Sequence, residues 1–186
     1  MNSLSLSALS LFFLASSATA QVPVGPGSVK LGKPEVSAPT TPEYQITGAN
    51  KRAKLGKWLE MEISFETIPA EIDELTLRYT VLIEKKLLTG EVTYMNILKG
   101  REHYGVMYLS PKTLERLTGG KPLSSAGVEN VWIEVARQGQ VLDKTSLKPG
   151  NVPNLPQVAG MIQNKSDTPF APLYHDRYEE LKPATR

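Results

Sequence analysis

The stretch "KWLEMEISFE", residues 57–66, alternates apolar and other side chains with a period of two. One face carries the aliphatic residues and a phenylalanine, and the other carries the polar residues and a tryptophan: Leu59, Met61, Ile63 and Phe65 against Trp58, Glu60, Glu62, Ser64 and Glu66. This alternation is typical of a β-strand with one face on a core and the other toward solvent. It predicts that the fold is built from sheets that each bury one face.

The same alternation recurs along the middle of the chain. It appears in "LTLRYTVLIE" (75–84), "EVTYMNIL" (91–98), "HYGVMYL" (103–109) and "VENVWIEVARQGQVLDKTSL" (128–147). Between two of these runs, "KGRE" is expected to form a hairpin turn, because Gly100 tolerates a positive φ. About seven short strands at this spacing predict an all-β fold, an antiparallel β-sandwich. A small barrel such as an OB-fold is the alternative, with fewer strands expected.

One short helix is predicted between the strands. Ser110 is a suitable N-cap, Pro111 suits the first helical position and Gly119 suits the position after the last turn. The helix has barely two turns, so packing must hold it.

The N-terminus is expected to be an export signal. Residues 1–20 contain an apolar run and end in Ala18-Thr19-Ala20, a small-x-small pattern before a cleavage site. The run is shorter than the roughly 20 residues that span a bilayer, and no later segment is apolar enough to do so. The chain has no cysteine and a net charge of +2. A bacterial envelope protein fits these features, whereas a nucleic-acid partner would need a concentrated basic face.

The composition divides the chain into four parts. We expect a signal peptide at 1–20, a flexible Pro/Gly-rich leader at 21–42, the β-sandwich at 43–148, and a Pro-rich linker with an aromatic C-terminal segment at 149–186.

The C-terminal stretch "TPFAPLYHDRYEELKP", residues 168–183, is unusually aromatic for a chain end. Tyr174, Tyr178 and Leu181 are spaced i, i+4 and i+7, which predicts one face of a short helix, with Phe170 ahead of it. Such a helix is not stable alone in water. The segment is therefore expected to fold back on its own sandwich or to dock on another protein.

No motif indicates an enzyme. His103 is expected to be an ordinary exposed histidine at the start of a strand, and no G-x-S-x-G nucleophile motif occurs. His175 and Glu179 are four residues apart, but two ligands without a third do not make a metal site. The sequence thus predicts no catalytic residue, no metal and no cofactor.

Two tryptophans, Trp58 and Trp132, fall out of phase with the apolar residues of their own strands. An outward tryptophan on a sandwich is covered by a chain end, contacts a protein partner, or stacks on a sugar. We expect coverage or partner contact. A carbohydrate-binding module that uses both tryptophans on one open face is the alternative function.

The phrases "GKWLEMEISFET", "LTLRYTVLI" and "NKSDTPFAPLYHDRYEELKP" together resemble small exported proteins of Verrucomicrobia that are encoded beside type IV pilus components. The resemblance covers most of the mature chain. It implies an immunoglobulin-like fold and no enzymatic residues. It also implies that the protein is exported to the periplasm, or is associated peripherally with the outer membrane or the cell surface.

The sequence and the resemblance together predict a non-enzymatic structural or adaptor module of the cell envelope, linked to type IV pilus assembly, with envelope or pilus-assembly proteins as partners. The residues expected to contact a partner are Trp58, Trp132, Phe170, Tyr174, Tyr178 and Leu181.

Overall fold

The computed structural model describes residues 24–44, 54–68, 70–121 and 125–183. The predicted signal peptide, residues 1–20, lies outside the described residues. Eleven strands and one α-helix are found in the described part. In chain order they are β1 (Val29–Leu31), β2 (Glu35–Ser37), β3 (Leu59–Thr67), β4 (Ile72–Ile83), β5 (Lys86–Ile97), β6 (Gly100–Leu109), α1 (Pro111–Thr118), β7 (Asn130–Arg137), β8 (Gln140–Ser146), β9 (Gln157–Ala159), β10 (Ile162–Asn164) and β11 (Glu180–Leu181).

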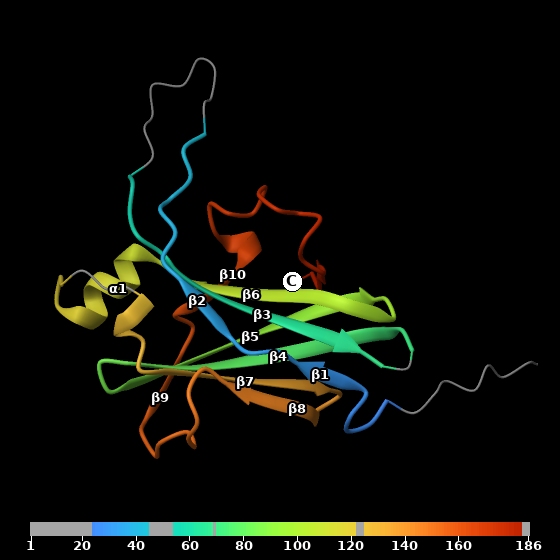
Figure 1. Ribbon diagram of the computed structural model, residues 1–186. Helices are drawn as coiled ribbons and strands as arrows, with labels where there is room; N and C mark the ends of the chain where they lie inside the picture. The colour runs from blue at the N-terminus through green and yellow to red at the C-terminus, as the bar shows by residue number, and fades with distance from the viewer. Residues whose placement is uncertain (1–23, 45–53, 69, 122–124, 184–186) are drawn as a thin grey trace, which may run out of the picture.

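The strands form two sheets that pack face to face (Figure 1). The first sheet has the order β1-β3-β6-β10, with β2 also beside β3. The second has the order β11-β5-β4-β7-β8, with β9 also beside β5. All pairs are antiparallel except β5 with β9. The predicted immunoglobulin-like antiparallel β-sandwich is confirmed.

The alternation in the sequence corresponds to burial in the structure. In β3 every second residue is buried, and the inward residues of β4 and β7 meet them from the opposite sheet. Two sheets that each bury one face form a single shared core. The predicted helix is also confirmed: the Ser110 hydroxyl accepts a hydrogen bond from the Thr113 N–H, and Gly119 ends the helix with φ 66°.

The hairpin turns depart from their predicted chemistry. Gly100 is the first residue of β6, and the residues with positive φ near this turn are Asn96 and Glu102. The β4–β5 hairpin turns at Glu84 and Lys85, both with positive φ. A Glu-Lys pair gives no sequence signal for such a turn, so the first residues of β5 were not predicted.

The chain ends contribute more to the sheets than expected. The leader was predicted to be flexible, but β1 and β2 within it pair with β3. The Leu31 N–H also donates to the Asp143 carboxylate of β8 at 2.8 Å, which ties the first sheet to the second. The Pro-rich linker likewise contains β9 and β10. With β11, these short strands bring the described strands to eleven, against about seven predicted.

Candidate functional site

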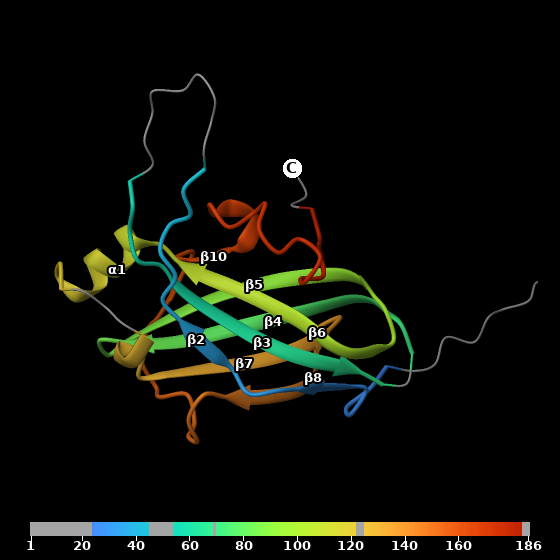
Figure 2. The same cartoon turned by 45° about the horizontal axis from the view of Figure 1, so that its top comes forward.

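The C-terminal strap, defined here as residues 165–182, lies across the outer face of the first sheet. It follows β10 and ends as β11, which pairs with β5 of the second sheet. Figures 1 and 2 both show this segment, in red, on the side of the sandwich that carries β6 and β10. Within the described residues the strap contains no α-helix, so the predicted helix is wrong. Tyr174 instead adopts a φ of 51° within a run of turns.

An aromatic cluster fixes the start of the strap. The Phe170 ring stacks on Tyr108 of β6, with 4.9 Å between centroids and 6° between planes. The same ring meets Trp58 edge-on at 5.6 Å. All three side chains are buried together with Val106, on the face opposite the main core. Trp58 is therefore covered by a segment of its own chain, as one of the sequence-based interpretations expected.

A carboxylate of β3 holds the second half of the strap. Arg177 donates to both oxygens of Glu62, at 2.6 and 3.2 Å, and the Tyr178 hydroxyl donates to Glu62 at 2.5 Å. Burial raises the pKa of Glu62, but the hydrogen bonds from Arg177 and Tyr178 outweigh this effect and lower the pKa below its usual value. The Arg177 guanidinium also lies 3.8 Å from the Tyr104 ring centroid. Glu62 therefore anchors the strap.

A second carboxylate of this face, Glu60, binds the neighbouring strands. Glu60 accepts a hydrogen bond from the Tyr108 hydroxyl at 2.9 Å and another from Ser37 of β2 at 2.9 Å. Burial and the Glu60 charge raise the pKa of Tyr108 far above its usual value. The outward glutamates of β3 were expected to lie on the solvated side of the strand. Glu62 instead binds the strap, and Glu60 binds Tyr108 of β6 and Ser37 of β2.

His103 is buried, contrary to the expectation of an exposed histidine. Its ring stacks on Phe65 at 5.2 Å, and its Nδ1 lies 2.7 Å from a carboxylate oxygen of Glu179 in the strap. His175 is exposed. In the part of the chain that the structure describes, no group of three His, Asp or Glu side chains is arranged to hold a metal ion. His103 thus fastens the strap.

A cavity of 350 Å³ remains under the strap. The Lys165 side chain lines it and is 8% exposed, and its ammonium donates to the Ala171 carbonyl at 2.9 Å. The same ammonium lies 5.4 Å from the Tyr178 ring centroid. Burial lowers the pKa of Lys165. These contacts join the two halves of the strap to each other.

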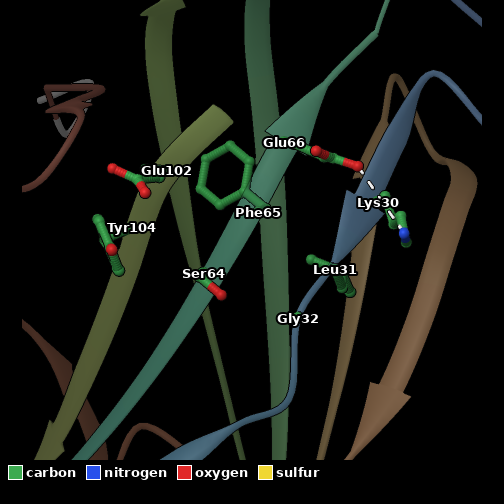
Figure 3. Close-up of a pocket in the computed structure, with 8 residues that line it drawn as sticks. All are labelled: Lys30, Leu31, Gly32, Ser64, Phe65, Glu66, Glu102 and Tyr104. Atoms are coloured by element: carbon green, nitrogen blue, oxygen red, sulfur yellow. Dashed lines mark ion pairs between the residues drawn. The ribbon is translucent and has the colours of Figure 1, made fainter. Parts of the chain in front are cut away.

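A second hollow, of 430 Å³, lies on the outer face between β1 and β6 (Figure 3). It contains two carboxylates, but Figure 3 shows Glu66 directed toward Lys30 and Glu102 directed away from it. The Lys30 ammonium lies 3.9 Å from Glu66. The two carboxylates do not converge on one point, which paired acid–base catalysis would require.

The remaining predicted contact residues are scattered. Trp132 lies on β7 in the second sheet, half-buried, and its Nε1 donates to the Gly150 carbonyl at 2.7 Å. Tyr174 is 67% exposed, and Leu181 packs against the main core as part of β11. Trp58 and Trp132 therefore belong to different sheets and share no face. The strap brings together Trp58, Phe170 and Tyr178 but not the other three.

Two residues of the outer face were missed as strap contacts, Val106 and Tyr108. The segment "VMYL" at the end of β6 has no polar residue, whereas a strand with one wet face alternates. That continuous apolar run was the available signal that something covers β6.

Within the described residues, no helix has the length and apolar character needed to cross a membrane. No curated protein matches the chain. The fold is similar to that of a crystal structure of a protein from Akkermansia muciniphila, a Verrucomicrobium, with a TM-score of 0.71 and 23% sequence identity over 84% of this chain and 94% of that one. A protein-family model matches residues 20–185, nearly the whole chain. The chain therefore belongs to the family that this model describes.

Proposed function

We propose that this protein is a non-enzymatic structural or adaptor module of the cell envelope that acts through protein–protein contact, in association with type IV pilus assembly. The exported, periplasmic or outer-membrane-associated location belongs to the same proposal. Family membership and the similarity to a verrucomicrobial structure support it.

One observation carries the proposal. The residue types that most often perform chemistry are engaged in holding the chain's own strap: Glu62 by Arg177 and Tyr178, and His103 by Glu179. In these contacts Glu62 and His103 stabilise the surface that the strap covers. What the fold then offers to other molecules is shape, charge and exposed apolar side chains.

Trp132 and Tyr174 are the predicted contact residues that stay accessible. Tyr174 projects from the strap, and Trp132 lies on the outer face of the second sheet. Aromatic side chains in such positions are common anchors of protein interfaces. Trp58 and Phe170 act instead within the fold.

Cross-linking with pull-down from envelope fractions tests this function. The mature wild-type protein serves as bait beside Trp132→Ala and Tyr174→Ala variants. We expect specific envelope proteins with the wild type and reduced recovery with at least one variant. Equal recovery from all three baits would remove both residues from the interface.

A glycan array run on the same three proteins separates the carbohydrate alternative. Glycan binding that Trp132→Ala abolishes, without recovery of any protein, would replace the adaptor function with sugar binding. Because the two tryptophans lie on different faces of the sandwich, we expect no glycan binding that depends on them.

A further inference from the structure

A groove of 720 Å³ lies between α1 and the residues that lead into β3. Figure 1 shows α1 at one end of the sandwich, next to the start of β3. Leu55 and Pro111 line the groove from these two elements, and Pro169 of the strap also lines it. It is separate from the cavity under the strap and from the hollow of Figure 3.

The groove is basic. Its lining includes four exposed lysines, Lys54, Lys57, Lys112 and Lys121, against a single described acidic residue, Glu115. Across the described part of the chain, none of these four ammonium groups forms an ion pair with a carboxylate. The whole chain carries a net charge of only +2, so positive charge is concentrated here. A site lined by one sign of charge attracts ligands of the opposite sign.

The lining of the groove also includes apolar side chains. Leu55 is 51% exposed, and Pro111 of α1 and Pro169 of the strap line the same groove. Trp58 is the one aromatic residue among the described lining residues, and it is 8% exposed because Phe170 and Tyr108 pack against it. An exposed aromatic face for stacking on a sugar is therefore missing from the described lining. A flat membrane surface also fits a concave groove poorly.

The groove is preformed. Thr41 Oγ1 accepts hydrogen bonds from the Gly56 N–H at 3.1 Å and from Trp58 Nε1 at 3.0 Å, and donates to the Gly56 carbonyl at 3.2 Å. A Cβ on Gly56 would lie 2.6 Å from Pro111 Cγ, so the two walls meet closely at this point. On the third side, the Tyr44 hydroxyl donates to the Pro169 carbonyl. A rigid groove binds with less loss of conformational entropy than a flexible one.

We propose that this groove binds an acidic peptide segment of a partner protein, with an apolar side chain of the peptide against Leu55 and its carboxylates among the four lysines. The inference rests on the proposed adaptor function and names the surface and the partner chemistry that it uses. Peptide recognition of this kind combines a few apolar anchors with charge complementarity at the rim.

Fluorescence anisotropy tests the binding with a labelled peptide of alternating leucine and glutamate, and with a second peptide that has lysine in place of glutamate. The proteins are the wild type, Lys54→Glu/Lys57→Glu in the groove, and the charge-matched control Lys33→Glu/Lys99→Glu outside it. We expect the acidic peptide to bind the wild type and the control. The groove variant should bind at least about tenfold more weakly, and added salt should weaken wild-type binding.

The proposal is overturned if the acidic peptide does not bind the wild type, if the lysine peptide binds equally well, or if both double variants lose the same affinity. Binding to vesicles that contain anionic phosphatidylglycerol is measured with the same proteins. If the vesicles bind through the groove lysines and the acidic peptide does not bind, the groove is a membrane-binding site. Urea unfolding midpoints check that the variants fold. If the first groove variant does not, Lys112→Glu/Lys121→Glu on the opposite wall replaces it.

Photo-crosslinking distinguishes failure of the groove from failure of the function. A photo-reactive phenylalanine analogue is placed at Leu55 in one sample and at Trp132 in another, in envelope fractions. Capture of a partner through its acidic segment at Leu55 supports the groove. Capture at Trp132 alone overturns the groove and leaves the adaptor function in place, whereas capture at neither position contradicts the adaptor function.

Discussion

Replacement of Phe170 by alanine is the sharpest perturbation of the strap. The side chain is 5% exposed, stacks on Tyr108 and meets Trp58 edge-on. Burial of a phenylalanine contributes about 2–3 kcal/mol, and each aromatic pair adds roughly 0.5–1.5 kcal/mol. Because the strap can release locally and relax, we expect a loss near the lower end of the range for Phe→Ala substitutions, about 3 kcal/mol.

Urea unfolding followed by tryptophan fluorescence measures this loss. With a slope of about 2 kcal/mol per M, the unfolding midpoint of Phe170→Ala should fall by about 1.5 M. Trp58 should also become more exposed in the folded variant, which would shift its emission to longer wavelength.

The control is Tyr174→Ala in the same strap. Tyr174 is 67% exposed, so its replacement should change the free energy of unfolding by no more than about 0.5 kcal/mol. If the two variants lose the same stability, or if Phe170→Ala loses none, the strap is not anchored through Phe170 and our account of the outer face is wrong.

Four further substitutions test other contacts. The pKa of Glu62 is lowered in the folded protein, so its charged form stabilises the fold above the usual carboxyl pKa of 4.5, and this stabilisation is lost as the pH falls through the lowered pKa. Between about pH 7 and about pH 3, the urea unfolding midpoint should therefore fall less steeply for Glu62→Gln than for the wild type. The Tyr79 hydroxyl is buried without a hydrogen-bond partner in the described structure, so Tyr79→Phe should leave the free energy of unfolding unchanged or raise it. Tyr94→Phe removes the hydroxyl that accepts a hydrogen bond from the Val106 N–H, so it should lower the free energy of unfolding by about 1–2 kcal/mol in the same assay. Gly56→Ala should lower the thermal midpoint by an amount equivalent to about 1–3 kcal/mol, since the new Cβ collides with Pro111, and an unchanged midpoint would contradict that packing.

The central strands were predictable because their signal is local. In β3 and β4 the alternation of side chains along one strand already specifies which face is buried. The caps of α1 are also local, since Ser110 and Gly119 act on backbone groups within one turn. Such features need no knowledge of distant residues.

The short strands were not predictable for the opposite reason. β1 exists because Val29–Leu31 pairs with the far end of β3, and β2 because Glu35–Ser37 pairs near its start. Three residues among prolines and glycines carry no strand signal of their own. Their structure depends on pairing with distant strands, and the intrinsic β-strand propensity of a segment does not reflect such pairing.

The strap shows how a correct observation led to a wrong structure. The spacing of Tyr174, Tyr178 and Leu181 fits a helix, yet the three side chains have different environments: solvent, Glu62 and the main core. So short a segment has little intrinsic helical stability, and contacts with the sheet decide its path. The expectation that an aromatic segment must cover some surface was the sound part of the interpretation.

Hydrogen–deuterium exchange in the isolated full-length mature protein tests most directly whether the strap belongs to the fold. The Lys182 N–H donates to the Thr93 carbonyl of β5, and the Ala171 and Leu173 N–H groups donate within the strap. Our account predicts that these amides exchange far more slowly than those of an unfolded peptide, and that Phe170→Ala speeds their exchange. Exchange across residues 165–182 at the rate of an unfolded chain would contradict it, and would mean that this segment needs another protein to become ordered.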